Sequence, residues 1–273
     1  MQDRFFIFIL SLIFSVGSVK AESFIFPSSR TDALGGTVVL STPTPSEQLL
    51  SGTPLEQTEK LSVDFGYTRQ YDLKELDIIY SAVSYRMQNF SLAAGFSQTG
   101  EPDLYTQKNM RLAVLYSKSF YTIGNFITGE FHDFNKRYNS VNKISYGLSV
   151  QVRHKDFIFS SVLENLNRPS LTENSPKANR ILTFYGELPG LKKYKTTLTF
   201  STQADDENKY GIGESVKISQ VGTLMFGFST TPVEFGGGMK LKWKDNSVIY
   251  NASYHPVLGL THTISFLLMI LHN

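Results

Sequence analysis

The chain has 273 residues, of which 41% are apolar and 13% aromatic, so it holds enough apolar material for a large folded domain and is not mainly disordered. Charged residues make up only 18% and the formal net charge is +2, which gives no indication of a nucleic-acid partner. The chain has no cysteine, which excludes a disulfide scaffold.

The first predicted element is a secretory signal peptide over residues 1–21. Arg4 opens a short basic region, residues 5–19 are mainly apolar, and Val19-Lys20-Ala21 fits a cleavage site. The apolar run is short for a membrane span. We therefore expect Sec export with removal of this segment, rather than an uncleaved anchor helix.

Residues 22–60 are predicted to form an irregular N-terminal hatch or plug. The segment contains four prolines, the pair Gly35-Gly36 and many serines and threonines, which interrupt regular structure. A wide barrel has a lumen that its own side chains cannot fill. We expect the segment to fold into such a lumen; a flexible tail is the alternative.

From residue 61 onward, apolar and polar residues alternate with a period of two, as they do on the two faces of a strand. Leu61, Val63, Phe65 and Tyr67 share one parity, and the residues between them are small or polar. The pattern recurs in fourteen segments of about ten residues: 61–71, 76–86, 88–97, 110–118, 120–131, 141–152, 156–166, 180–187, 192–202, 209–218, 222–230, 234–243, 247–254 and 260–270.

These segments predict an all-β fold, namely a transmembrane antiparallel β-barrel of about 14 strands over residues 61–273, surrounded by outer-membrane lipid. Strands of about ten residues cross a bilayer at a tilt, and an even strand number suits a closed barrel. Alternate connections are longer, among them 98–109 and 167–179, as the outer loops of such barrels are. A soluble β-sandwich also alternates, but its strands are usually shorter.

The last predicted hairpin carries two histidines, His255 and His262, with Pro256 and Gly259 as its turn residues. A turn with an even number of residues would place the histidines opposite each other, whereas an odd turn would place them on opposite faces. The odd turn keeps Ile264 and its apolar neighbours toward lipid. We therefore expect a closure hairpin, that is, a structural hairpin at the end of the barrel sequence, and not a pair of histidines that binds a metal ion or acts in catalysis.

No hydrolase motif is present, because the chain has neither G-x-S-x-G nor H-E-x-x-H. His262 with Ser265 is a thin basis for a phospholipase site, and Asp205-Asp206-Glu207 is better explained as a solvated turn than as a calcium site. We expect a non-enzymatic protein with no cofactor and no metal site.

The stretch FIFPSSRTDALGG, residues 24–36, resembles the mature N-terminus of outer-membrane barrels of the FadL-like superfamily, and most closely the PorV and PorQ proteins of type IX secretion. The matching residues are Phe26, Pro27, Ser29, Arg30, Ala33, Leu34, Gly35 and Gly36. Residues 227–243 and 250–262 resemble the last strands of the same group, and residues 162–167 resemble a strand end in its middle.

This resemblance implies the outer membrane of a Gram-negative-type bacterium and a non-enzymatic role in type IX-like protein secretion or surface attachment, with secretion-system proteins as partners. The alternative is passive transport of hydrophobic small molecules such as fatty acids and hydrocarbons. The candidate plug motif comprises Phe26, Pro27, Arg30, Leu34, Gly35 and Gly36. Arg30 in a lumen would need a carboxylate or carbonyl partner, and the glycine pair would permit close backbone approach.

Overall fold

The computed structural model describes residues 26–56, 60–101, 105–134, 140–170, 177–190, 193–203 and 208–271. The predicted signal peptide, residues 1–21, lies outside the described residues, as does the acidic turn at 205–207.

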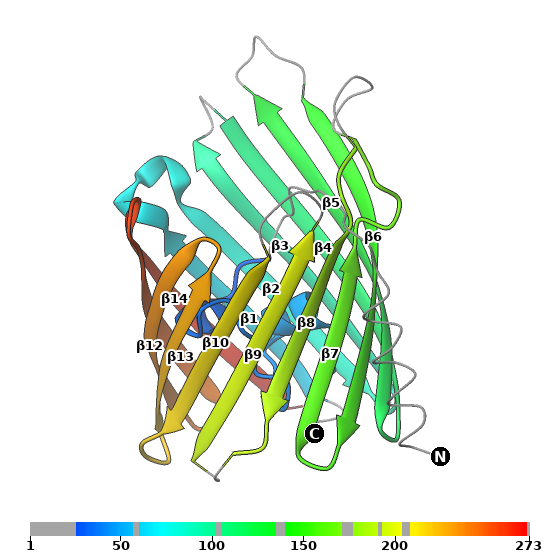
Figure 1. Cartoon of the computed structure of the whole chain (residues 1–273), viewed down its shortest axis with the longest axis vertical. Helices are drawn as coiled ribbons and strands as arrows, with labels where there is room; N and C mark the ends of the chain where they lie inside the picture. Colours follow the sequence, from blue (N-terminus) through cyan, green and yellow to red (C-terminus); the bar gives the residue numbers. More distant parts are fainter. Residues whose placement is uncertain are drawn as a thin grey trace.

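The described residues form fourteen antiparallel strands that close into one barrel (Figure 1). Each strand pairs with its neighbours in sequence, and the first pairs with the last, so the predicted all-β barrel is confirmed. The strands are β1 (Lys60–Arg69), β2 (Ile78–Met87), β3 (Phe90–Glu101), β4 (Tyr105–Lys118), β5 (Tyr121–Phe134), β6 (Val141–His154), β7 (Phe157–Glu164), β8 (Ile181–Leu188), β9 (Tyr194–Gln203), β10 (Lys209–Lys217), β11 (Gly222–Thr230), β12 (Val233–Trp243), β13 (Asn246–His255) and β14 (Gly259–Leu271).

The two ends of the barrel differ in their connections. At one end β1 begins, β14 ends and most strands are joined by tight hairpins, and we call it the turn end. We call the opposite end the loop end. Gln88, Ser119, Lys155 and Lys244 sit in the tight hairpins with φ between 49° and 56°. This left-handed backbone matches the twist of a two-residue hairpin. The longest connection, 165–180, lies at the loop end.

Strands β3 to β6 are longer than the sequence pattern predicts, and in Figure 1 they rise above the rest of the wall at the loop end. The predicted loop 98–109 is wrong in its bounds, because β3 continues to Glu101 and β4 begins at Tyr105. Backbone pairing continues through polar pairs such as Gln98 with Lys108. Apolar alternation marks only the part of a strand with an apolar outer face, whereas the hydrogen-bond ladder needs no such face.

The two faces of the wall have opposite character. Along β1, Ser62, Asp64 and Thr68 are buried toward the lumen, whereas Phe65 is 40% exposed on the outside. At the seam between β1 and β14, Phe65 stacks on Phe266 at 5.2 Å between ring centroids. Exposed large apolar residues encircle the outside in this way on every strand except β8, which is typical of a barrel surrounded by lipid.

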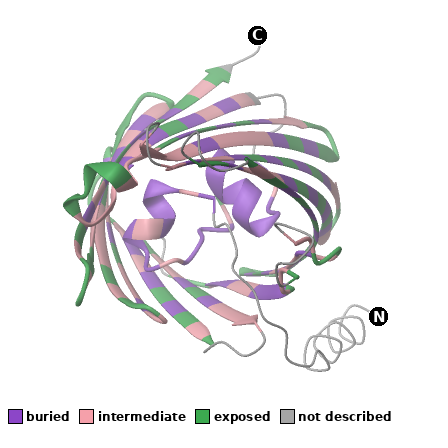
Figure 2. Cartoon of the chain, turned by 90° about the horizontal axis from the view of Figure 1, so that it is seen from above, coloured by how far each residue is buried: buried purple, intermediate pink, exposed green. Residues whose placement is uncertain are grey.

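Residues 26–56, the described part of the predicted plug, lie within the lumen (Figure 2). Part of the segment is helical rather than irregular: α2 spans Ser29–Ala33 and α3 spans Pro45–Ser51. A capping box joins Thr44 and Glu47 at the start of α3, and Gly52 ends it with φ 65°. No helix within the described ranges is long and apolar enough to cross a membrane.

Candidate functional site

One side of the plug lies directly on the backbone of the wall. The inner face of β10 to β12 carries five glycines, which we call the glycine face: Gly211, Gly213, Gly227, Gly236 and Gly238. A Cβ atom on Gly227 would overlap the carbonyl carbon of Leu34, and one on Gly236 would overlap the carbonyl oxygen of Asp32. The plug can therefore dock in this position only because these wall residues have no side chain.

The predicted Gly35-Gly36 pair belongs to the same contact. Both residues have positive φ, 64° and 80°, and a Cβ on Gly35 would overlap the backbone of Phe228. Leu34 is fully buried beside them. Glycine is thus required on both sides of this contact. In the plug it is required because the backbone has positive φ, and in the wall because there is no space for a side chain.

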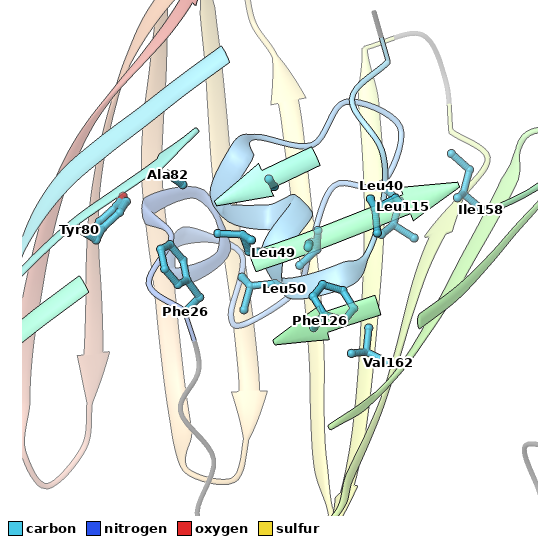
Figure 3. Close-up of a cluster of buried hydrophobic side chains, with 13 residues drawn as sticks. Phe26, Leu40, Leu49, Leu50, Tyr80, Ala82, Leu115, Phe126, Ile158 and Val162 are labelled. Carbon is cyan, nitrogen blue, oxygen red and sulfur yellow. The ribbon is translucent and has the colours of Figure 1, made fainter. Parts of the chain in front are cut away.

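The opposite side of the plug docks through apolar side chains (Figure 3). Phe26 and Leu49 are fully buried and fill the space above Gly95 of β3. The Phe26 ring meets Tyr80 edge-on at 6.4 Å. Burial of one such side chain stabilises the docked plug by about 1.5–3 kcal/mol. The rest of the cluster consists of Val38, Leu40 and Leu50 from the plug and Ala82, Ala93, Ala113, Leu115, Phe126, Ile158 and Val162 from the wall.

Arg30 has the carboxylate partner that its burial requires. Its Nε donates to Oε1 of Glu47 at 2.8 Å, and its Nη2 bonds to Oε2 of Glu47 and to the carbonyl oxygen of Thr42, the latter at 2.6 Å. The Glu47 carboxylate also accepts a bond from the Thr44 backbone N–H at 2.8 Å. The pair joins α2 to α3, and removal of one partner would leave a buried charge at a cost of about 3–5 kcal/mol.

Sequence reasoning did not identify Glu47, although its signal was present. Thr44-Pro45-Ser46-Glu47 has the spacing of a capping box, which predicts the start of a helix at this point. That motif would have placed a buried carboxylate within the plug.

Polar bonds attach the plug around the circumference of the barrel. The Ser29 backbone N–H donates to the Tyr80 hydroxyl at 3.1 Å, and its carbonyl oxygen accepts from Asn251 at 2.6 Å. Further bonds join Thr37 to Thr197 at 2.5 Å, Ser41 to Glu187 at 2.8 Å and Gln48 to Ser91 at 2.7 Å. Attachment to β2, β3, β8, β9 and β13 fixes the orientation of the plug, which apolar packing alone would not.

The plug separates two lumenal cavities. The outer cavity, of about 290 Å³, opens toward the loop end and has plug residues Phe26, Asp32 and Leu50 in its floor. The second, of about 240 Å³, lies on the other side of the plug and includes Arg30 and Thr42 in its lining. α2 contributes to both, because Arg30 faces one and Asp32 the other.

The outer cavity has a mixed lining, with apolar side chains beside the charged groups of Asp32, Arg111, Glu164, Lys209 and Glu234. Ile78, Val162 and Ile181 line it from β2, β7 and β8. Arg111 is buried in its wall, pairs with Glu164 and lies 4.6 Å from the centre of the Phe126 ring. Among the described residues, the buried Nε and Nη2 atoms of Arg111 have no hydrogen-bond partner, and a buried donor left unpaired costs about 1–3 kcal/mol.

Asp32 is the titratable group on the outer face of the plug. The pKa of this carboxyl is raised to about 7, mainly by burial and also by the nearby Glu234. Hydrogen bonds from Thr263 and Asn251 and the charge of Lys209 oppose the shift. The Asp32 carboxyl is therefore close to half protonated at neutral pH.

The closure hairpin does not bring its two histidines together. Three residues, 256–258, connect β13 to β14, and His255 pairs with Gly259 whereas His262 pairs with Ala252. The two side chains thus lie on opposite faces. His255 Nδ1 accepts bonds from the backbone of the turn that contains Pro256, both at 3.1 Å. Gly259 begins β14 with φ 98° rather than lying within the turn.

His262 lies outside the barrel, where its Nδ1 is 2.9 Å from the Tyr250 hydroxyl. Ser265 points into the lumen and is buried, so the pair considered for a phospholipase site is on opposite faces as well. Within the described ranges, no group of three or more metal-ligating side chains is close enough to hold a metal ion.

Comparison with known proteins gives a likeness in fold. No family model matches the chain, and no curated protein matches it. The solved structure of the TodX monoaromatic hydrocarbon channel deltaS2 mutant aligns with a TM-score of 0.61 at 8% identity, over 91% of this chain and 99% of that one. The CymD monoaromatic hydrocarbon channel aligns with a TM-score of 0.60 at 8% identity, over 92% and 100%. At such low identity the likeness shows the barrel fold.

A side chain on the glycine face should release the plug. Gly227→Val places atoms in the space of Leu34, and overpacking of this kind costs about 1–3 kcal/mol. In planar bilayers we expect openings of the lumen to become at least about fivefold more frequent. The matched control is Gly237→Val on the outer face of β12, where an added Cβ has no neighbour closer than 4.0 Å. Equal behaviour of the two variants would contradict docking through the glycine face.

Plug docking should weaken as pH rises. A carboxyl whose pKa is about 7 when docked and 3.8 when free holds its proton better in the docked state, so docking loses stability between pH 3.8 and about 7. We expect fewer openings at pH 5 than at pH 8, and Asp32→Asn should flatten this difference. Asp133→Asn, at an exposed ion pair with Lys108, is the control. A pH profile unchanged by Asp32→Asn would refute the role of Asp32.

Proposed function

We propose that the protein is an outer-membrane β-barrel of a Gram-negative-type bacterium, exported by the Sec route, which passes small hydrophobic molecules without an enzymatic step. The observation that carries this proposal is the outer cavity, a recess within the lumen that opens toward the loop end and has a cluster of apolar side chains in its otherwise polar lining. The apolar band on the outer surface supports a position in lipid, with the tight hairpins on the periplasmic side.

The size of the outer cavity favours small ligands. A dry apolar cavity of about 150 Å³ accommodates benzene, and the outer cavity has about 290 Å³. Phe26, Leu50, Ile78, Val162 and Ile181 supply its apolar surface. A monoaromatic hydrocarbon or part of an acyl chain fits this volume, whereas a folded protein domain does not. The two hydrocarbon channels that share the fold support the same substrate class.

Arg111 would add selectivity to this recess. Its charge in the lining of the recess suits a ligand with an aromatic or carboxylate group at one end.

The role in type IX-like secretion or surface attachment stays a prediction that rests on the resemblance of residues 24–36 to PorV and PorQ. The lumenal cavity has the dimensions of a site for a small molecule. We therefore place hydrophobic transport first and secretion second.

Uptake by whole cells tests the proposal. In a Gram-negative host with an intact lipopolysaccharide layer and no channel of its own for such compounds, we expect the protein to raise the rate of uptake of radiolabelled toluene or decanoate, but not of glucose. Ile181→Asn, which replaces one apolar side chain of the recess with a polar one, should reduce this gain. Uptake no greater than that of cells with an empty vector would contradict transport and would leave secretion as the better hypothesis.

Passage past the docked plug requires the plug to move, and a disulfide can test this. The chain has no cysteine, so Thr37→Cys with Thr197→Cys would introduce one bridge between plug and wall where the two hydroxyls are 2.5 Å apart. We expect oxidation to abolish uptake of toluene and reduction to restore it. Ser117→Cys with Thr122→Cys bridges two wall strands away from the outer cavity, where the hydroxyls are 3.0 Å apart, and it should leave uptake unchanged. Full uptake by the oxidised plug-to-wall variant would show that the plug stays docked during passage.

A further inference from the structure

The second cavity, on the turn-end side of the plug, has an unusual concentration of positive charge. Its volume is about 240 Å³, and five lysines line it, so we call it the lysine cavity: Lys193, Lys195, Lys217, Lys240 and Lys242. Arg30, Val39 and Thr42 of the plug close it on one side. The lysines come from β9, β10, β12 and the turn before β9.

Strand alternation explains why these lysines converge. On β12, Gly236 and Gly238 face the plug, and Lys240 and Lys242 continue the same inward parity toward the turn end. The inner face of one strand thus serves two purposes, first as part of the glycine face and then as part of the lysine cavity.

Most of this charge is not neutralised by the protein. Arg30 is paired with Glu47, and Lys195 has Glu187 at 3.7 Å. Lys193, Lys217, Lys240 and Lys242 have no ion pair within 4 Å among the described residues. Asp64 is a further acidic group near Lys240, which leaves the basic groups in excess.

Lys240 is half-buried, and Lys193, Lys217 and Lys242 are exposed at the mouth of the recess. An anion that joins the four ammonium groups relieves the repulsion between them. The recess also contains hydroxyl groups, from Ser215 and Thr223, that can donate hydrogen bonds. Apolar lining is limited to Val39, Val221 and Met225, so the recess offers little to an acyl chain. Its chemistry therefore suits a compact anion with several acceptor oxygens.

We propose that the lysine cavity binds a phosphate group, either of free inorganic phosphate or of an anionic phospholipid headgroup that reaches the turn end. A phosphate monoester carries about two negative charges near neutral pH and three acceptor oxygens, which matches the number of unpaired lysines better than a single carboxylate does. The site is separate from the outer cavity, and its test does not depend on hydrocarbon transport.

Equilibrium dialysis of the full-length protein in neutral detergent tests the proposal, with radiolabelled inorganic phosphate and with dihexanoyl phosphatidic acid as probes. About 0.15 M NaCl limits diffuse attraction, because the Debye length is then about 8 Å. We expect saturable binding of at least one probe. Lys240→Gln with Lys242→Gln should raise the dissociation constant at least about tenfold.

The matched control is Lys118→Gln, at the turn end of β4 but exposed on the outer face, which should bind like the wild type. Tighter binding of phosphatidic acid than of inorganic phosphate identifies a headgroup site, and equal binding identifies a free phosphate site. If heat-modifiable migration shows that the double variant does not fold, the single variants Lys193→Gln and Lys217→Gln replace it. Absence of saturable binding of both probes, or equal loss in the Lys118→Gln control, would overturn the proposal.

Discussion

The structure depends on one geometric constraint: a closed wall of fourteen strands encloses more space than its own side chains can fill. The plug fills that space, and the wall is adapted to it differently on two sides. Toward β2 to β7 the contact is mainly apolar, with Phe26 and Leu49 at its centre, and hydrogen bonds to Tyr80 and Ser91 give it direction. Toward β10 to β12 it is backbone against backbone, which only glycines such as Gly227 permit. Apolar burial stabilises the first contact, and the second fits only where the wall has no side chains.

The buried pair of Arg30 and Glu47 follows from the same constraint. Both side chains are almost completely buried in the lumen, so neither charge is exposed to water. Their bond holds α2 and α3 together as one unit, whose two faces then line two cavities of different chemistry. The outer cavity has apolar side chains beside charged groups of both signs, whereas the lysine cavity is strongly basic. Any solute that crossed from one to the other would meet both environments in turn.

The period-two alternation was sufficient to predict all fourteen strands, because each spanning strand has an apolar outer face and a small or polar inner face. It failed where Gln98 and Lys108 pair beyond the apolar band, since hydrogen bonding there leaves no periodic mark. Within the plug, the sequence predicts that a buried Arg30 needs a partner. It does not by itself identify Glu47 as that partner, although the spacing of Thr44 and Glu47 indicates a capping box. The contact of Leu34 with Gly227 joins residues far apart in sequence, and no local pattern encodes it.

The seam between β1 and β14 has a consequence for assembly. The pairing runs from Lys60 with Leu271 to Arg69 with His262, so the wall closes only when the last strand meets the first. Contacts between chain ends form slowly, because a long loop must be closed first. The plug precedes β1, and the wall surrounds it laterally once the seam forms. From then on the plug can enter or leave only along the barrel axis, whereas before closure it can dock onto an open sheet.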